Sequence, residues 1–282
     1  MVRERIRQYF LLIKPLQTGL LLTTGLAGYM SARCPLFNLG TLLEVAGSLF
    51  LAISGSTLLN MWWDRDIDAK MGRTCRRPLA AGALSPTETL WVGIALSLLG
   101  IGWAWWVYPT YGVLVLAGWF FDVVVYTLWL KRRTCWSIVW GGVAGGMPVL
   151  AGRSLGVGHV DAIGILLALA VLLWIPTHIM TFSLRHLEDY QTAGVPTFPA
   201  RYGAATTRTI ISISSLLAAV AITLAAILLG MAWGYLRLLA VLSTGLVILA
   251  VGAWFRPTER VNFSLYKYAS LYMLAAMLLL AL

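Results

Sequence analysis

Long apolar blocks dominate the chain, and short polar segments interrupt them. A membrane-spanning helix needs about 20 mostly apolar residues. The blocks that reach or approach this length cover residues 14–33, 42–62, 88–107, 110–130, 136–152, 161–184, 207–229, 234–254 and 264–282. Lipid offers no partner to the backbone of an open sheet. We therefore predict an all-α, polytopic membrane protein with about nine transmembrane helices, built as a single domain over residues 1–282.

The weakest of these blocks is 136–152, because it is short and rich in glycine and contains Pro148. Small residues allow membrane helices to approach each other closely. We therefore predict a helix buried among its neighbours at this position.

Composition supports a membrane protein. The chain of 282 residues is 60% hydrophobic and only 11% charged, with a mean hydropathy of +0.82, whereas a soluble domain carries about 25% charged residues. The three cysteines (Cys34, Cys75 and Cys135) are odd in number and lack metal-binding spacing. They therefore predict neither a disulfide nor a zinc site.

The distribution of positive charge predicts the orientation. If the N-terminus lies inside, all of the 21 Lys and Arg residues except Arg33, Arg153 and Arg237 fall in inner segments. The positive-inside rule therefore predicts a cytoplasmic N-terminus and, with nine spans, an external C-terminus. The net charge of +10 then reflects topology, and we expect no nucleic-acid binding.

An acidic cluster follows the second apolar block. Asn60, Asp64 and Asp68 are spaced four residues apart, and on a helix each such step turns the side-chain direction by only about 40°. All three side chains therefore face one way at the inner end of the span, while Asp66 points elsewhere into solvent. Ionisable residues at a membrane helix are costly and are candidates for function.

The residues after this cluster are basic, namely Lys70, Arg73, Arg76 and Arg77. Mg²⁺ prefers oxygen ligands and commonly joins one or two carboxylates to substrate phosphates, and arginine forks match phosphate oxygens. Acidic ligands beside basic residues therefore predict a site for a Mg²⁺-bound diphosphate. For any single arginine, a salt-bridged cytoplasmic loop is an equally good interpretation.

A second polar cluster, with Arg185, Glu188 and Asp189, follows the sixth block, and His178 lies inside the block about two helical turns earlier. A histidine in this position is either a core residue hydrogen-bonded to a carbonyl or a functional residue. The sequence leaves both interpretations open.

The pattern Asn60-xxx-Asp64-xxx-Asp68 resembles the first aspartate-rich motif of the UbiA superfamily of intramembrane prenyltransferases. Within that superfamily the chain is most similar to the branch of protoheme IX farnesyltransferases. The segments that carry this similarity are Lys14-Pro15, 60–82, Tyr126–Gly145 and Pro176–Pro196. They extend over about two-thirds of the chain, whereas the last three blocks match only as apolar helices.

The resemblance implies a nine-helix bundle that uses Mg²⁺ to transfer farnesyl from farnesyl diphosphate to heme b, giving heme O. It implies a multi-pass protein in the lipid bilayer of the cell (plasma) membrane with a cytoplasmic active site, and it allows contact with heme A synthase or oxidase assembly proteins. It implies catalytic roles for Asn60, Asp64, Asp68, Asp189 and Arg185, of which the first four would bind the metal. The residues expected to bind substrate are Lys14, Arg73, Arg77, Tyr126, Lys131, Arg132 and His178.

One departure from the superfamily concerns the second acidic motif, where Arg185 stands in place of the usual first aspartate, as in the heme-modifying branch. Three alternatives remain at this point. One is a related prenyltransferase with a quinone-precursor, chlorophyllide or archaeal lipid acceptor. Another is a cation-coupled transporter, for which Glu44 and Asp122 are the acidic candidates within spans. The third is a heme-binding assembly factor without catalysis.

Overall fold

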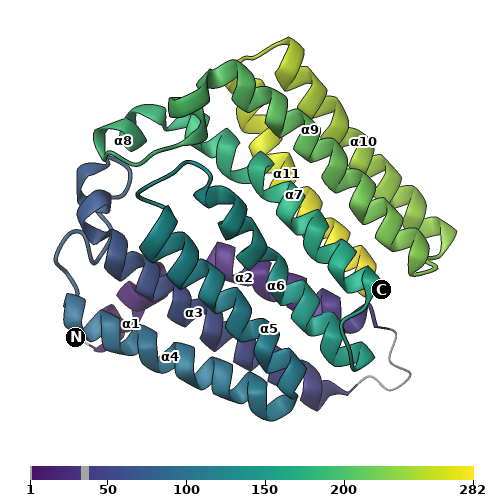
Figure 1. The fold of residues 1–282 in the computed structure, drawn as a ribbon, viewed down its shortest axis with the longest axis horizontal. Helices are drawn as coiled ribbons and strands as arrows, with labels where there is room; N and C mark the ends of the chain where they lie inside the picture. The colour runs from purple at the N-terminus through teal and green to yellow at the C-terminus, as the bar shows by residue number, and fades with distance from the viewer. Residues whose placement is uncertain (1, 33–37) are drawn as a thin grey trace.

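Helices are the only regular secondary structure in residues 2–32 and 38–282, which are the residues described by a computed structural model (Figure 1). Each predicted apolar block contains a long helical segment. In chain order these are α2 (Pro15–Met30), α3 (Leu39–Lys70), α4 (Pro86–Val107), α5 (Pro109–Trp119) continuing into the π-helix η1 (Phe120–Leu130), α6 (Ser137–Val157), α7 (Ala162–Arg185), α9 (Phe198–Leu228), α10 (Trp233–Phe255) and α11 (Glu259–Ala281). Two shorter helices are α1 (Val2–Leu12) and α8 (Leu187–Thr192). Cys34 and Arg33 lie outside the described residues.

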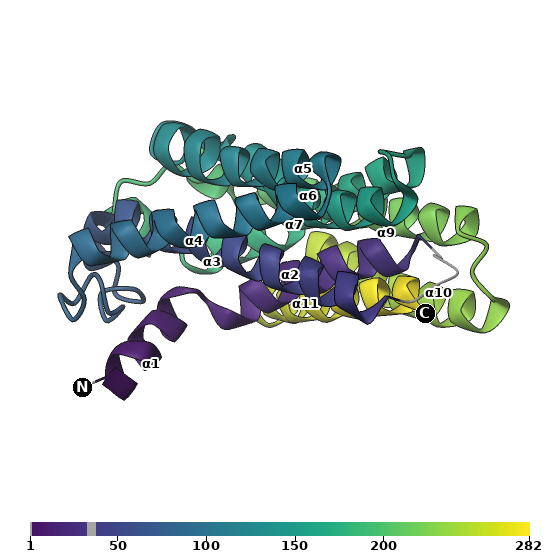
Figure 2. The same cartoon turned by 90° about the horizontal axis from the view of Figure 1, so that it is seen from below.

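Seven helices in the described part of the chain are long and apolar enough to cross a membrane. An eighth span results if α1 and α2, which meet at an angle of 61°, count as one broken span, and Figure 2 shows α1 turning away from the bundle. Helix α6 falls short because its glycines, Pro148 and Arg153 lower its hydropathy. The protein therefore crosses the membrane several times, and nine spans and the cytoplasmic N-terminus remain predictions.

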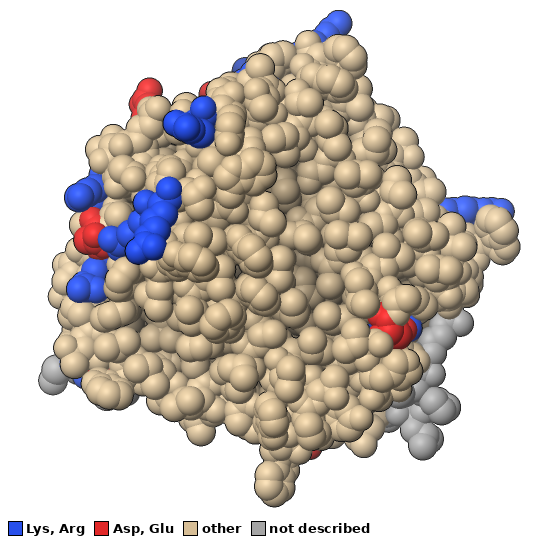
Figure 3. Space-filling view, in the orientation of Figure 1, with Lys and Arg blue, Asp and Glu red and all other residues tan. Residues whose placement is uncertain are grey.

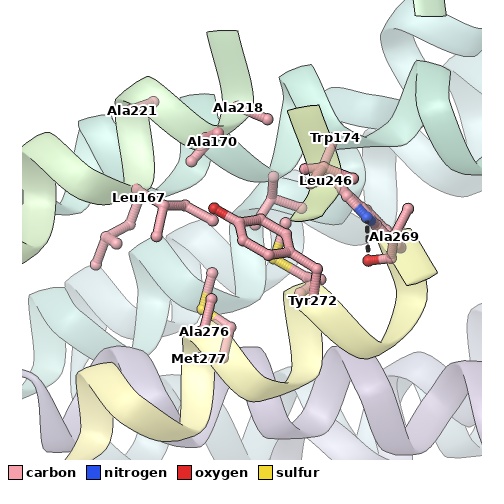
Figure 4. Close-up of a cluster of buried hydrophobic side chains, with 14 of the residues drawn as sticks. Leu167, Ala170, Trp174, Ala218, Ala221, Leu246, Ala269, Tyr272, Ala276 and Met277 are labelled. Atoms are coloured by element: carbon pink, nitrogen blue, oxygen red, sulfur yellow. Dashed lines mark hydrogen bonds between the residues drawn. The ribbon is translucent and has the colours of Figure 1, made fainter. Parts of the chain in front are cut away.

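The apolar core extends along the helices in two main clusters. The larger one joins α7, α9, α10 and α11, and the other joins α2 to α6. In the larger cluster the indole of Trp174 donates a hydrogen bond to the backbone oxygen of Ala269, over 2.7 Å, beside the buried ring of Tyr272 (Figure 4). Because this bond satisfies the indole N–H within the core, it fixes α7 against α11.

Helices α2 and α6 approach so closely that glycine is required between them. A Cβ atom at Gly28 would lie 2.2 Å from the carbonyl oxygen of Val149, and one at Gly152 would lie 1.9 Å from that of Gly25. Small residues at such crossings allow two membrane helices to pack backbone against backbone. The predicted burial of the 136–152 block is thereby explained, because its glycines face α2, α7 and, at Gly141, η1.

Charged side chains gather at one end of the bundle. Helix α3 extends to Lys70, two turns beyond the predicted end of its apolar block. It carries the acidic cluster to the same end as α8 and the segment that links α3 to α4 (Figure 1). Figure 3 shows Lys, Arg, Asp and Glu concentrated along this edge, while the broad face of the bundle in that view is nearly free of charge. The candidate site lies at this end.

Candidate active site

Helix α3 and the π-helix η1 face each other through two polar contacts. The Asn60 Nδ2 donates a hydrogen bond to the Thr127 Oγ1 over 2.8 Å, and one turn further along, Lys131 donates to the Asp64 carboxylate. Thr127 in turn donates to the backbone oxygen of Asp122 over 2.7 Å, five residues earlier. π-Helical turns are rare and occur often at functional sites. Here the turn brings Thr127 and Lys131 into register with the four-residue spacing on α3.

Two oxygens in this contact have no hydrogen-bond partner. They are Asn60 Oδ1 and Asp64 Oδ1, both buried in side chains that are only 7% and 1% exposed. Leaving a buried acceptor unpaired costs about 1–3 kcal/mol, so such atoms point to a ligand. Two oxygens one helical turn apart fit Mg²⁺, which favours oxygen ligands.

No cluster of three or more His, Cys, Asp or Glu side chains suited to a metal occurs among the described residues. A Mg²⁺ ion held by Asn60 and Asp64 would therefore complete its coordination with water and phosphate oxygens, which is its usual behaviour. The residues present fit the ion as part of a substrate complex.

Asp68 is buried one turn beyond Asp64 and makes a different contact. Both of its oxygens accept hydrogen bonds from Arg77, at 2.9 and 2.8 Å, and its backbone oxygen accepts one from Thr74 at 2.8 Å. Both contacts with the carboxylate come from one nitrogen, Arg77 Nη1, and they hold the segment after α3 against the helix. Asp68 therefore holds Arg77 in place at this end of α3, where its Nη1 also lies 3.5 Å from the Met61 sulfur.

A basic pocket of about 280 Å³ opens beside this pair. Its lining residues are Leu11, Leu12, Lys14, Met61, Arg73, Arg76, Arg77 and Pro78. Lys14 is the one non-glycine residue in the described chain with a positive φ, at 51°. A backbone held in this sparsely populated region commonly marks a functional position. Lys14 is also near enough to Asp64 and Asp68 to interact with them electrostatically.

The predicted substrate residues after η1 differ in their environment. Lys131 lies 5.4 Å from the centre of the Tyr126 ring. Burial lowers the pKa of Lys131, but Tyr126 and Asp64 outweigh this effect, so its pKa is raised and the ammonium stays charged. Arg132 instead binds Asp66 through contacts of 2.6 and 2.8 Å. Asp66 is more than half exposed, as predicted for a solvated residue.

The second polar cluster packs against the segment after α3. Asp189 accepts a hydrogen bond from the Gly72 amide over 3.3 Å. The guanidinium of Arg73 lies 4.8 Å from the centre of the Phe182 ring and 6.0 Å from that of Tyr190. These contacts join α7 and α8 to the end of α3. They do not bring Asp189 into one carboxylate cluster with Asp64 and Asp68.

His178 and Arg185 both turn towards α11. The His178 ring lies between Trp174 and Tyr266, with ring centres 4.9 and 4.8 Å away, and its Nδ1 is 3.0 Å from the Ser270 hydroxyl. The guanidinium of Arg185 lies 4.0 Å from the centre of the Phe263 ring. Arg185 therefore faces α11 and not the oxygens on α3.

Sequence reasoning named Tyr126 on η1 but missed Thr127 beside it and the contributions of α11. Nothing in the sequence marks Thr127 as the partner of Asn60, because a lone threonine in an apolar helix is common. On α11 a signal was present, since Lys267 is a charged residue within three residues of the start of an apolar block. Tyr266 and Ser270, one residue before and three after it, contact His178.

Comparison with known proteins gives one consistent result. The UbiA prenyltransferase family matches residues 21–278. A protoheme IX farnesyltransferase of Pyrobaculum islandicum is 37% identical over 263 residues, covering 93% of this chain and 94% of that protein.

Two solved structures share the fold. A structure described as giving insights into the biosynthesis of digeranylgeranylglyceryl phosphate synthase in membranes superposes with a TM-score of 0.80 and 19% identity, covering 99% of this chain and 98% of that one. A UbiA homologue from Archaeoglobus fulgidus bound to GPP and Mg²⁺ has a TM-score of 0.70 and 16% identity, covering 98% and 100%.

Proposed function

This chain belongs to the UbiA prenyltransferase family and is a prenyltransferase, and we propose that it transfers farnesyl from farnesyl diphosphate to heme b to make heme O. The observation that carries the donor half of this proposal is the pair of buried, unpartnered oxygens on Asn60 and Asp64, set beside a basic pocket. The acceptor half rests on the relatives that are named protoheme IX farnesyltransferases.

The donor would bind through its diphosphate. Asn60 and Asp64 would hold Mg²⁺ through their free oxygens, while Asp68 would position Arg77 and Asp189 would hold the segment after α3 through the Gly72 amide. Lys14, Arg73 and Arg77 from the basic pocket would contact the phosphate oxygens, as arginine forks do well. Lys131 would keep Asp64 oriented, while Tyr126 and Arg132 would border the same face. When bound, Mg²⁺ would neutralise negative charge that grows on the diphosphate.

Cations around the diphosphate favour the step in which charge moves onto it. The bond between the allylic carbon and the diphosphate oxygen breaks, and both electrons leave with the oxygen. The π electrons of a heme vinyl group form the new carbon–carbon bond. Water adds its oxygen to the vinyl carbon that is left electron-poor, and the released diphosphate takes up the proton that the water loses. Aromatic side chains near the reacting carbon stabilise such a cation.

The charge distribution supports a cytoplasmic site. Among the described residues the basic pocket, Lys131 and Arg132 share one end of the bundle with the basic α1 helix. By the positive-inside rule this end faces the cytoplasm. We propose that the enzyme acts in the cell membrane and draws both substrates to this face, where a heme A synthase or an oxidase assembly protein would take up the product.

An archaeal lipid acceptor is the alternative that a specific observation favours. The fold superposes well on a structure described for a digeranylgeranylglyceryl phosphate synthase. At 19% identity this similarity concerns the fold alone. The 37% identity to a protoheme IX farnesyltransferase and the arginine at position 185 favour heme b.

A turnover assay tests the proposal. Purified protein in detergent would be incubated with farnesyl diphosphate, Mg²⁺ and either heme b, a quinone precursor or a glycerol phosphate lipid, and the products identified by mass. Asp64→Ala serves as the inactive control. We expect a heme O mass that requires Mg²⁺ and Asp64. Diphosphate release with a product from another acceptor would discard heme b, and the absence of diphosphate release with every acceptor tried would contradict prenyl transfer.

A further inference from the structure

A line of aromatic side chains runs along the contact between α7 and α11, and one of its members, Phe182, lies beside Arg73 of the basic pocket. The Tyr266 ring stacks on His178 and lies 5.7 Å from Phe182 and 6.0 Å from Phe263, nearly parallel to the latter. These rings are partly exposed along the contact between the helices. Flat apolar groups in this arrangement suit a flat apolar ligand.

Two cations lie over one ring at the charged end of this line. The guanidinium of Arg185, on α7, is 4.0 Å from the centre of the Phe263 ring, and the ammonium of Lys267, on α11, is 4.5 Å from it. Two positive charges held this close repel one another. Cation–π contact with a single ring offsets this repulsion only in part.

Acidic neighbours do not neutralise this pair. Among the described residues Arg185 has one carboxylate near it, that of the exposed Glu259 at 3.7 Å, and Lys267 has none within salt-bridge range. An exposed ion pair at that distance contributes at most about 1 kcal/mol. The pair therefore retains charge for anionic groups of a ligand.

The spacing along α7 relates this pair to His178. Arg185 and His178 are seven residues apart, which is about two turns or roughly 10 Å of helix, and they share one face. A ligand lying along the rings from His178 to Phe263 would therefore reach both cations with one edge.

We infer that Arg185 and Lys267 bind the two propionate groups of the porphyrin acceptor, whose ring lies against the aromatic side chains between α7 and α11. This inference rests on the proposed function and adds the acceptor's position and its polar recognition. It also explains why an arginine stands at 185. A carboxylate there would repel a dicarboxylate ligand, whereas arginine binds one in a bidentate way.

The test compares heme b with its dimethyl ester, which keeps the ring and loses both negative charges. Each would be titrated by absorbance into the purified full-length protein, without farnesyl diphosphate, for wild type, Arg185→Gln, Lys267→Gln and the double variant. The matched control is Arg260→Gln, which removes an exposed cation of α11 that is not among the cation–π partners of Phe263 in the described part of the chain.

We expect each single variant to weaken heme b binding about tenfold, since one charge-assisted hydrogen bond is lost. The double variant should weaken it by about a hundredfold. Binding of the dimethyl ester should not change in any variant, and Arg260→Gln should match wild type. In turnover, the KM for heme b should rise while the KM for farnesyl diphosphate stays the same.

Two results would overturn the inference. Equal affinity of wild type for heme b and its dimethyl ester would show that the propionates are not recognised. Equal weakening of both ligands by the variants would indicate a structural role. If either result is found and wild type still makes heme O, the proposed function stands and only the propionate assignment fails. A wild type that neither binds nor farnesylates heme b contradicts both the propionate assignment and the proposed function.

Discussion

Lys131 donates a hydrogen bond to one oxygen of Asp64, while the other oxygen of this buried carboxylate has no partner in the described chain. The ammonium thus fixes the orientation of the carboxylate and offsets its charge, and the second oxygen stays available. A carboxylate bound on one side and open on the other is suited to hold a metal ion on a substrate.

Replacing Asp64 with Asn tests the open oxygen with little change of shape. We expect kcat/KM to fall by about a thousandfold or more, because the metal that neutralises the leaving group loses its charged ligand. The matched control is Asp66→Asn, which changes an exposed carboxylate two residues away and should keep activity within about threefold. Equal losses in both variants would show that the charge of the whole helix end matters and not the Asp64 oxygen.

Replacing Lys131 with Met tests the buried pair. Asp64 would then be left charged and unpaired, so we expect the free energy of unfolding to fall by about 3–5 kcal/mol. Combining Lys131→Met with Asp64→Asn should restore most of that loss without restoring activity. Unfolding followed in detergent measures the first effect and product formation the second. A double variant as unstable as the single one would contradict this pairing.

Thr127→Val tests the contact that orients Asn60. Without the Thr127 hydroxyl the Asn60 amide loses its acceptor and can rotate its open oxygen away. Loss of a residue that orients a metal ligand costs about 10–100-fold in metal affinity. We therefore expect the Mg²⁺ concentration at half-maximal activity to rise by about the same factor. Thr206→Val, at an exposed position of α9, is the control. An unchanged Mg²⁺ requirement would argue against a role for Asn60 Oδ1.

Gly28→Ala tests the close packing of α2 on α6. The added methyl would meet the Val149 carbonyl at 2.2 Å, whereas a methyl at Gly19 on the same helix meets nothing within 4 Å. We expect Gly28→Ala to lower the free energy of unfolding by about 1–3 kcal/mol and Gly19→Ala to leave it unchanged or raise it slightly. Equal effects at the two positions would contradict the packing described here.

The pair of Arg153 and Asp161, at the end of the bundle away from the site, predicts a pH dependence of stability. Burial raises the pKa of Asp161, but hydrogen bonds from Arg153 and the Gly164 amide outweigh it, so the pKa lies below its ordinary value of about 3.9. The stabilisation is therefore present above that value and is lost as pH falls through the lowered pKa.

Asp161→Asn should destabilise the protein at pH 7, by an amount on the order of 3 kcal/mol, because Arg153 is left buried without a counter-charge. The difference from wild type should shrink below about pH 4. Thermal unfolding of both proteins between pH 3 and pH 7 measures it. A difference that does not change with pH would exclude the ion pair as its cause.

Periodicity and charge in the sequence predict much of this architecture. The apolar blocks mark where the long helices lie, and the four-residue spacing of Asn60, Asp64 and Asp68 places them on one helical face, because both patterns depend only on local geometry. The apolar block was predicted to end at residue 62, and α3 continues beyond it to Lys70, as the four-residue spacing indicated, with Arg77 and Thr74 in contact with Asp68.

Pairings between distant residues were not predictable from those patterns. The sequence groups Asp68 with Asn60 and Asp64, and in the fold Arg77 occupies both Asp68 oxygens. It likewise groups Arg185 with Asp189, although Arg185 faces Phe263 and Glu259 on α11. Tertiary packing decides which acidic and basic residues pair. Local patterns in the sequence therefore do not reveal these pairings.

The central claim is that the open oxygens of Asn60 and Asp64 hold a metal-bound isoprenyl diphosphate. It is tested most directly by the affinity of the purified protein for farnesyl diphosphate, measured by calorimetry in Mg²⁺ and in a chelator, for wild type and Asp64→Asn. We predict that Mg²⁺ raises the affinity of wild type by about tenfold or more and that the variant loses most of this gain. Equal affinity with and without Mg²⁺ in wild type, or an equal gain in the variant, would contradict the account.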